Sequence, residues 1–502
     1  MSEMKIWVTN PLERIRKDCK AKSVTDYALF AAKNEYESFQ IIINAGDSAV
    51  TVENIEISDF VTSDGKVLSD SVTVYREHYV EIVKNSPSSC MVMQEIPGLI
   101  PDALIPALHP KTGKPLSENA RFRAFPYVVE QNAAQPYFID VHIPSGTADG
   151  FYTAEYTVVT DKGNFKGNLS LTVWDVELPK EQVQKSLFGG WSGTNRDKAE
   201  VAAQHRMFMN IADKEHQEYL YNNYGYNIAS IGFWSGADID TCKMQDAPDV
   251  EDIKARKATY FEKLDCFAYT ADEIGHCKAL YKQLIEWGQA MHKAGVKQFV
   301  VMPPMKELFD DGLGEGRSAV DIWVVLPKQY DGYKPNVDEA IRKGDSVWTY
   351  NCLVQDNYSP KWLLDYPLIN FRIHPGFINY SIKSEGFLFW VADNYKNRED
   401  VWTRLNDKFD AEVWNGDGIL FYPGDELGIE DSFVPSLRAK AIRDGFEDYE
   451  LCNEIARRGK GALAQSYSES IGKDFTNWTQ DNDVLLSNRV KLGEAFRLGG
   501  KR

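Results

Sequence analysis

The first 180 residues carry the hydrophobic pattern of β structure. Short runs alternate apolar and polar residues or gather β-branched and aromatic ones, at Lys5–Thr9, Phe39–Asn44, Val50–Ile57, Val72–Tyr75, Tyr127–Glu130, Tyr137–Ile143, Tyr152–Thr160 and Leu169–Val176. Turn signals such as Asp161-Lys162-Gly163 separate the runs. Many short strands without a helical pattern between them predict a β-sandwich domain over residues 1–180.

After about residue 185, helical stretches alternate with short apolar strands. The clearest helix is His276–Lys293, where apolar residues recur on one face at Leu280, Leu284, Trp287 and Met291. Strands are expected at Ser186–Gly189, Ile228–Phe233, Cys266–Tyr269, Gln298–Met302, Val320–Leu326, Ser346–Asn351, Gly386–Val391 and Gly418–Tyr422. This alternation predicts a (β/α)8 TIM barrel over residues 186–430, with a doubly wound open sheet as the alternative. Residues 431–502 are expected to form a helical C-terminal segment packed on the barrel.

Composition and charge narrow the class of function. Of the 502 residues, 43% are hydrophobic and 26% charged, as in ordinary globular proteins. The net charge of −18 disfavours nucleic-acid phosphates and anionic membranes as partners. No apolar run approaches the ~20 residues of a membrane span, and Met1–Val8 has no apolar leader core. We therefore expect no nucleic-acid partner, no membrane insertion, and a cytoplasmic protein, or a secreted one if a leader has been removed. The oligomeric state stays open.

The cysteines and the cofactor motifs give negative expectations. The seven cysteines form no CxxC motif and are scattered, at positions 19, 90, 242, 266, 277, 352 and 452. Reduced thiols are expected rather than a disulfide framework or a zinc site, since His276-Cys277 lacks the spaced partners of a metal centre. The motifs HExxH, GxxxxGK[ST] and GxSxG are missing, as is a GxGxxG that opens a helix. We predict no cofactor and no obligatory metal.

Two adjacent acids, Asp272-Glu273, stand where a predicted barrel strand runs into a helix. In a barrel, this junction lies on the carboxyl-terminal face, where active sites are built. Two carboxylates held close cannot both ionise easily, so one keeps its proton to higher pH, as a general acid for a glycosidic oxygen requires. Alternatively, the acids cap the following helix and favour its positive end. Spacing alone leaves both interpretations open.

Other residues have weaker assignments. A second acidic pair, Asp425-Glu426, lies in a loop bounded by Gly and Pro, which favours a solvated role. Arg372 and His374 fit buried pairing and ligand contact equally well. Five aromatic residues lie in or just after predicted barrel strands, where they would wall a pocket as a set, although core packing explains each one singly: Trp323, Trp348, Tyr350, Trp390 and Tyr395.

Recurring phrases along the chain point to a family. The strongest are GDGILFYPG at 416–424, PSLR at 435–438 and IRDGFEDYE at 442–450, and others lie at residues 31–40, 101–106, 173–175, 320–323, 348–350 and 386–390. Over nearly its whole length, the chain resembles glycoside hydrolase family 123, the β-N-acetylgalactosaminidases, and related proteins that share their catalytic domain. The family carries an Asp-Glu pair, usually followed by Pro, after the fourth barrel strand. Asp272-Glu273 matches this pair, with Ile274 in place of Pro.

The resemblance implies an exo-acting β-N-acetylgalactosaminidase with a retaining, substrate-assisted mechanism. The 2-acetamido oxygen of the sugar attacks the anomeric carbon in such a mechanism. Glu273 would protonate the leaving oxygen and then act as base toward water, while Asp272 would orient the acetamido N–H. The expected partner is a glycan or glycoconjugate with a terminal β-linked N-acetylhexosamine.

Substrate contacts are expected from residues placed near strand ends. Tyr350 is the candidate for holding the acetamido group, and Trp348 and Trp390 are candidates for packing on the sugar. The full expected substrate-binding set is Tyr350, Trp348, Trp390, Trp323, Tyr395 and Asp321. Two alternatives stay open. A related glycosidase of different sugar specificity would need a further acid, for example Asp321 or Asp393, and a non-catalytic carbohydrate-binding protein would need none.

Overall fold

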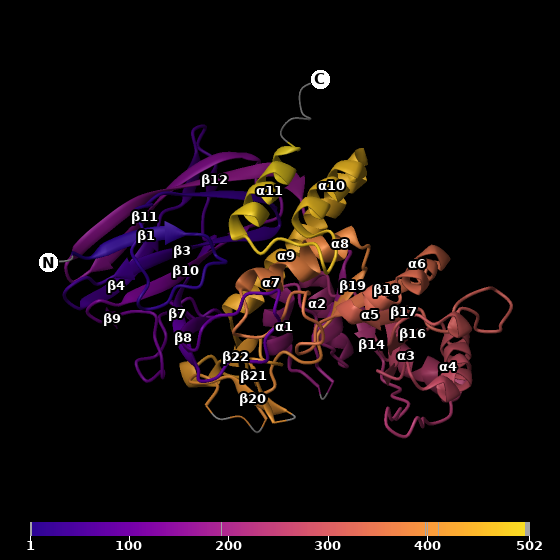
Figure 1. Cartoon of the computed structure of the whole chain (residues 1–502). Helices are drawn as coiled ribbons and strands as arrows, with labels where there is room; N and C mark the ends of the chain where they lie inside the picture. The colour runs from indigo at the N-terminus through magenta and orange to yellow at the C-terminus, as the bar shows by residue number, and fades with distance from the viewer. Residues whose placement is uncertain (1–2, 192, 397, 399, 410, 497–502) are drawn as a thin grey trace.

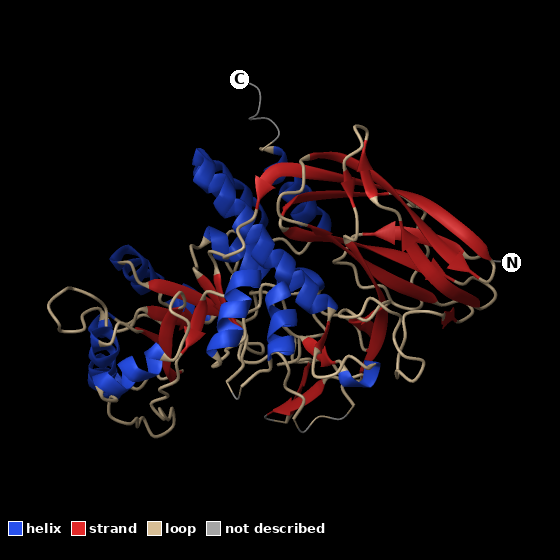
Figure 2. Ribbon diagram, turned by 180° about the vertical axis from the view of Figure 1, so that it is seen from behind, coloured by secondary structure: helices blue, strands red, loops and turns tan. Residues whose placement is uncertain are grey.

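The computed structural model describes residues 3–191, 193–396, 398, 400–409 and 411–496. Residues 1–2 of the predicted β-sandwich domain and residues 497–502 of the predicted helical C-terminal segment lie outside this part of the chain. Figure 1 shows a β-rich region from the first third of the chain and, at the opposite end, a smaller sheet with its own helices. Between them lie α9 (Leu437–Ile455), α10 (Gly461–Gly472) and α11 (Asn482–Glu494), and the reverse view in Figure 2 shows the same order.

Two sheets make up the β-rich region. The first has the order β1-β3-β10-β7-β8, with β1 (Lys5–Thr9), β3 (Glu35–Asn44), β10 (Ala134–Ile143), β7 (Val72–Ile82) and β8 (Gly98–Pro106). The second has the order β2-β12-β11-β4-β9, with β2 (Tyr27–Lys33), β12 (Gly163–Glu177), β11 (Gly150–Thr160), β4 (Val50–Ile57) and β9 (Tyr127–Val129). In addition, β5 (Phe60–Thr62) pairs with β11, and β6 (Val67–Leu68) pairs with β5. Alternate residues such as Phe39 and Ile41 of β3 share one apolar core with Tyr156 and Leu171 of the second sheet.

Seven parallel strands form the sheet that positions the site. Their order is β14-β15-β16-β17-β18-β19-β13, so that strands follow one another around the sheet in chain order and the last pairs with the first. The strands are β13 (Lys185–Leu187), β14 (Ile228–Ser230), β15 (Asp265–Asp272), β16 (Lys297–Val301), β17 (Ile322–Val325), β18 (Ser346–Tyr350) and β19 (Gly386–Leu388). A doubly wound sheet reverses its strand order at a switch point, so this sequential order disfavours that alternative.

The parallel sheet is nearly closed into a barrel. Between its end strands runs an extended segment, residues 207–210. Phe188 N–H, at the end of β13, donates to the Phe208 carbonyl at 2.8 Å. On the other side, Ser230 N–H donates to the Asn210 side chain at 3.0 Å. The prediction of a (β/α)8 barrel is therefore confirmed only in part, because the described residues contain seven assigned barrel strands rather than a regular set of eight.

Helices alternate with the parallel strands: α1 (Arg196–Gln204), α2 (Lys214–Tyr224), α3 (Val250–Ala258), α4 (Tyr281–Lys293), α5 (Pro327–Gly332), α6 (Lys334–Lys343), α7 (Leu368–Ile373) and α8 (Asn379–Ser381). In α4, the predicted face of Leu284, Trp287 and Met291 is buried. The predicted start at His276 is wrong. The helix begins at Tyr281, after a 3₁₀ turn over Lys278–Leu280, because the chain is still turning away from β15 at residues 273–277.

The C-terminal helices are held by buried ion pairs. Arg443 of α9 contacts Asp140 of β10 at 2.8 and 2.9 Å, and Arg438 contacts Asp102 of β8 at 3.0 and 2.9 Å. Arg372 of α7 binds the carboxylate of Asp448 in α9 at 2.7 and 2.9 Å. These bidentate contacts confirm the interpretation of Arg372 as a buried structural residue. They also join the β-rich region to the barrel-like sheet, and the predicted helical C-terminal segment is present.

Two hairpins lie outside the parallel sheet: β20 (Asn406–Phe409) with β21 (Glu412–Asn415), and β22 (Phe421–Pro423) with β23 (Phe433–Pro435). The predicted barrel strand Gly418–Tyr422 is wrong, because this segment enters β22 and pairs antiparallel with β23. A short apolar run has the same composition in a buried hairpin as in a parallel strand, so the pattern alone did not distinguish them.

Candidate active site

Asp272 and Glu273 lie at the carboxyl end of β15. Asp272 is the last residue of the strand, and Glu273 follows with φ of 53°. A left-handed conformation is uncommon for a residue with a Cβ, and such strain gathers at functional sites. Glu273 N–H still donates to the Val301 carbonyl of β16 at 2.7 Å, which fixes the backbone at this point. The helix-cap interpretation is wrong, because α4 begins at Tyr281 and the residue before it, Leu280, makes no side-chain cap.

The carboxylate of Glu273 is exposed and meets a buried phenol. Tyr350, the last residue of β18, donates its hydroxyl to Glu273 Oε1 at 2.8 Å and is 7% exposed. Burial and the neighbouring Glu273 carboxylate raise the pKa of the Tyr350 phenol well above its usual value. The phenol therefore stays protonated and acts as a fixed donor. Two of the predicted site residues are thus brought together from separate barrel strands.

Asp272 is the more buried acid of the pair. Burial raises the pKa of Asp272 to about 6, and the Glu273 carboxylate adds to this shift, while a hydrogen bond from Tyr269 opposes it. The two acids therefore have different environments. Asp272 changes its charge near neutral pH, whereas the Glu273 carboxylate faces solvent. Unequal carboxyl groups in one site are the usual arrangement for acid-base chemistry.

Three half-exposed tryptophans stand around the pair. Trp191 follows β13 and Trp234 follows β14, and their rings contact the Tyr269 ring at centroid distances of 5.2 and 6.0 Å. Trp390 follows β19, and its carbonyl accepts from Trp191 Nε1 at 2.9 Å. Exposures of 43%, 49% and 43%, for Trp191, Trp234 and Trp390, leave the rings available to a ligand. Aromatic faces beside polar groups suit the C–H faces of a sugar.

Three of these residues were missed in the sequence: Trp191, Trp234 and Tyr269. Trp191 and Trp234 each come one or two residues after a predicted strand, and the rule that selected Trp390, aromatic residues in or just after predicted strands, includes both positions. Tyr269 was placed within a strand, and only the fold shows that its ring reaches Asp272.

The structure places other predicted contacts away from the pair. Trp348 is 1% exposed inside the sheet, where its ring packs on Phe299. Trp323 is buried and donates Nε1 to Asp345 at 3.0 Å, on the side of β17 that faces Phe309.

Asp321 precedes β17 and so lies at the opposite edge of the parallel sheet from Asp272. Its carboxylate binds Arg317 at 2.6 Å and His292 at 2.9 Å. Asp321 and Trp348 line a cavity of about 770 Å³ at that amino-terminal edge. Tyr395 is also taken up in packing, since its hydroxyl donates to the Phe421 carbonyl at 2.8 Å.

The remaining sequence candidates have structural partners. Glu426 of the second acidic pair forms an exposed ion pair with Arg121, and Asp425 accepts from Asp431 N–H at 2.8 Å. His374 is fully buried, with Nε2 3.2 Å from Thr349 Oγ1. These contacts explain each residue without a ligand.

The expectation of reduced thiols is wrong for two cysteines. Cys242 and Cys277 form a disulfide with a Cα–Cα distance of 5.4 Å, and the other five cysteines are free. Their separation of 35 residues follows no motif, so the pairing could not be predicted from the sequence. Within the described ranges, these cysteines and His276 are the one group of at least three metal-ligand side chains found together. The two sulfurs bond each other and so are not thiolate ligands.

A family comparison supports the resemblance drawn from the sequence. Residues 305–455 match the model of the glycoside hydrolase 123 catalytic domain, which confirms that resemblance. The match includes β17, β18, β19 and α9, whereas Asp272-Glu273 precedes it. Among the curated proteins compared, none matches this chain.

A solved structure shares the fold. A family 123 glycoside hydrolase from Clostridium perfringens, described for its hydrolysis of glycolipid glycans, is similar with a TM-score of 0.67 and 12% identity, covering 99% of this chain and 98% of that one. At this identity the likeness establishes a common fold. A putative α-galactosidase from Bacteroides fragilis NCTC 9343 covers 75% of this chain and 65% of that one at 12% identity, but its TM-score of 0.23 carries no argument.

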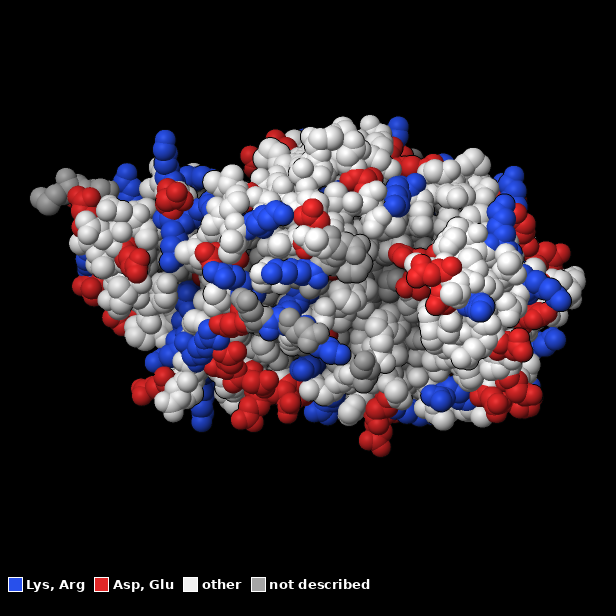
Figure 3. All heavy atoms as spheres, turned by 60° about the horizontal axis from the view of Figure 1, so that its bottom comes forward, with Lys and Arg blue, Asp and Glu red and all other residues white. Residues whose placement is uncertain are grey.

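The surface and the helices add two observations. On the face drawn in Figure 3, groups of acidic and basic side chains lie close together. None of the helices in the described part of the chain is long and apolar enough to span a membrane.

Proposed function

We propose, from the premise that this chain carries a glycoside hydrolase family 123 catalytic domain, that it is an exo-acting β-N-acetylgalactosaminidase. The observation that carries the proposal is the unequal acid pair at the end of β15. Glu273 is exposed and held by a phenol, and Asp272 is partly buried with its pKa raised to about 6. Family membership gives the reaction class, and this pair gives it two carboxyl groups with different tasks.

The proposed mechanism uses the substrate's own acetamido group. Its carbonyl oxygen bonds to the anomeric carbon as the bond to the leaving oxygen breaks, and Glu273 gives its proton to that oxygen. The product of this step is a cyclic oxazolinium ion, which stays bound to the protein. Water then attacks the anomeric carbon while the bond between this carbon and the acetamido oxygen breaks, which restores the acetamido group, and Glu273 takes up the proton that the water loses. No carboxylate nucleophile is needed, as in other substrate-assisted glycosidases.

Asp272 supports the developing positive charge in this scheme. Its ionised carboxylate accepts the acetamido N–H and orients the carbonyl oxygen toward the anomeric carbon. A partly dehydrated carboxylate interacts more strongly with a cation than a solvated one does. In this mechanism Tyr350 holds Glu273 in place. This role takes the place of the contact with the acetamido group that the position of Tyr350 in the sequence indicated.

The tryptophans provide the platform for the glycan. Trp390 keeps its expected role of packing on the sugar, and Trp191 and Trp234 take the place of the buried Trp348. The Clostridium perfringens enzyme is described for glycolipid glycans, and an open rim of aromatic rings suits a sugar attached to a larger glycoconjugate. A glycan or glycoconjugate with a terminal β-linked N-acetylhexosamine is therefore the proposed substrate.

A panel of 4-nitrophenyl glycosides tests the function. The panel includes the α and β anomers of N-acetylgalactosamine, N-acetylglucosamine and galactose, with and without a thiazoline inhibitor. We expect turnover of the β-N-acetylgalactosaminide, inhibition by the thiazoline, and loss of turnover in Glu273→Gln. The matched control is Glu286→Gln, a substitution on the exposed face of α4. Undiminished turnover by Glu273→Gln would overturn the assignment.

One observation favours a second enzyme function. Asp393 follows β19, close to Trp390 in sequence, and burial raises the pKa of its carboxyl. It is a better candidate for a further acid than Asp321, which lies at the other edge of the sheet. A glycosidase for a sugar without an acetamido group would use Asp393 with Glu273. In that case the galactoside is hydrolysed, the thiazoline has no effect, and Asp393→Asn abolishes turnover. Binding of glycans without any hydrolysis would indicate a carbohydrate-binding protein.

A further inference from the structure

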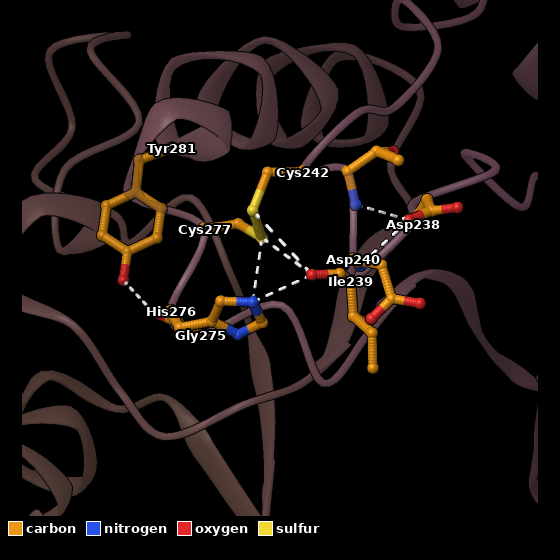
Figure 4. Close-up of a disulfide and its surroundings, with 9 residues drawn as sticks. Asp238, Ile239, Asp240, Cys242, Gly275, His276, Cys277 and Tyr281 are labelled. Carbon is orange, nitrogen blue, oxygen red and sulfur yellow. Dashed lines mark hydrogen bonds between the residues drawn. A yellow bond between two sulfur atoms is a disulfide. The ribbon is translucent and has the colours of Figure 1, made fainter.

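The disulfide lies close to the acid pair along the chain. Cys277 is four residues after Glu273, and Cys242 lies in the loop that joins β14 to α3, residues 231–249, here called the wall loop. Figure 4 shows the two sulfurs joined, with the His276 ring and the Ile239 carbonyl beside them. One bond thus ties the wall loop to the segment that follows the proposed catalytic residues.

The base of the wall loop carries a tryptophan of the site. Trp234 lies against Tyr269, the residue that hydrogen-bonds to Asp272. The next residue, Ser235, is anchored to β15, because its N–H and its hydroxyl both donate to the Thr270 carbonyl, at 3.1 and 2.5 Å. Trp234 therefore stands next to the point where the loop leaves its anchor on β15.

The tip of the wall loop has few other attachments. Asp238 and Lys243 form a single bridge that closes a small turn, and the residues between them are mostly exposed. The tip is tied to the rest of the protein by the disulfide and by His276, whose Nε2 lies 2.9 Å from the Ile239 carbonyl. Just after the tip, the Met244 carbonyl accepts from the Gln283 side chain at 3.2 Å, and the Gln245 carbonyl accepts from Trp287 Nε1 at 2.9 Å. A solvent-exposed loop with so few buried contacts opens at low cost once its cross-link is removed.

The acid pair itself has separate supports. Glu273 is held by its backbone bond to Val301 and by the Tyr350 hydroxyl, and Ile274 is fully buried. None of these contacts involves a sulfur. Cleavage of the disulfide therefore frees the wall loop more than it displaces the Glu273 carboxylate.

We propose that the Cys242–Cys277 disulfide is a positioning clasp that holds the wall loop, and with it Trp234, in the arrangement that binds the glycan. Reduction breaks this disulfide. A dithiol such as dithiothreitol transfers two electrons and two protons to the sulfurs, which gives two cysteine thiols and the cyclic disulfide of the reagent. The effect on turnover rests on the proposed function, whereas the effect on the loop does not.

The first measurement is independent of substrate. Amide hydrogen exchange of residues 236–244 is followed in the oxidised protein, in the protein treated with dithiothreitol, and in Cys242→Ser and Cys277→Ser. Exchange rises in the treated protein and in both variants. Cys90→Ser, at an exposed free cysteine, is the matched control and leaves exchange unchanged. Equal exchange before and after reduction would overturn the clasp.

The second measurement separates positioning from general loss of structure. With the β-N-acetylgalactosaminide, opening of the clasp raises KM roughly two- to tenfold, the range expected for one lost aromatic contact, and leaves kcat almost unchanged. Both serine variants match the reduced protein and no longer respond to dithiothreitol. A fall in kcat with KM unchanged contradicts the proposal. If the oxidised protein turns over no glycoside, the proposed function fails while hydrogen exchange still decides on the clasp.

Discussion

The protein holds acids in two different environments, beside cations in one and beside phenols in the other. Asp140, between the β-rich region and α9, is contacted by Arg443 and Lys440, and these cations lower its pKa although burial acts in the opposite direction. At the end of β15, burial and Glu273 raise the pKa of Asp272, and the phenols of Tyr269 and Tyr350 donate hydrogen bonds to the two acids. A cation neutralises a buried carboxylate and fixes it, whereas a phenol orients it and leaves its charge available. The comparison distinguishes acids that hold the fold from acids suited to chemistry.

The largest expected effect lies in the site. Glu273→Gln keeps the shape of the side chain but removes the proton that the leaving oxygen receives. We expect kcat/KM on the aryl β-N-acetylgalactosaminide to fall by about 10³-fold, within the range for general acid-base catalysis. Circular dichroism and the unfolding temperature should match those of the wild type. A decrease of less than about tenfold would remove Glu273 from the acid-base role.

The structural acids are expected to show the reverse behaviour. Asp140→Asn leaves Arg443 and Lys440 buried without their carboxylate, so the free energy of unfolding should fall by about 3–5 kcal/mol. Glu155→Gln, which removes an exposed partner of Lys166, is the control and should cost less than about 1 kcal/mol. Urea titration followed by tryptophan fluorescence measures both. Equal effects of the two substitutions would contradict the comparison.

Tyr350→Phe tests whether the phenol orients Glu273. The change removes one hydroxyl and keeps the ring, so packing inside β18 is preserved. Loss of a hydrogen bond to a charged group, at about 1.5–3 kcal/mol, corresponds to a decrease of roughly 10- to 100-fold in kcat. Tyr395→Phe is a matched control, since that hydroxyl donates to a backbone carbonyl, that of Phe421. A similar loss in both variants would show that the effect is not specific to the site.

Much of this arrangement could be predicted from the sequence, and the limits have physical causes. The strand-helix alternation and the family phrases placed Asp272-Glu273 at the correct end of a barrel strand. They did not show which side chains converge there, because Tyr350 is 77 residues away and the disulfide partners follow no spacing rule. In β17, four apolar residues in succession, Ile322–Val325, leave no signal for which of them face inward.

The sequence also did not show how deep inside the sheet each side chain of a strand lies. Trp348 and Tyr350 lie on the same face of β18, two residues apart, and both were predicted at the site. Two residues rise by about 6–7 Å, which is enough to bury one ring among Phe267 and Phe299 while the other reaches Glu273. Periodicity gives the face of a residue, and only the closed sheet gives its depth.

The pH dependence sharpens the role of Asp272. In the proposed mechanism this carboxylate must be ionised, and its pKa is raised to about 6. Activity should therefore fall as the pH drops through about 6, by about tenfold between pH 7 and pH 5 for a single group. In Asp272→Asn, the residual activity should lose this acid limb. A wild-type limb near pH 4, the usual range for a carboxyl group, would contradict the assignment.

The smallest effect concerns stability and has the opposite sign to that at Asp140. A raised pKa means that folding disfavours the charged form of Asp272, so its ionisation costs stability above about pH 6 and costs nothing below about pH 4, where the carboxyl is protonated in both states. Asp272→Asn removes that cost. We expect it to raise the free energy of unfolding at pH 7 by about 1–2 kcal/mol, less than the full shift implies because the side chain is partly exposed, and to have no effect near pH 4. Urea titrations at the two pH values measure the difference. A variant that is less stable than the wild type at pH 7 would place Asp272 with the acids that hold the fold.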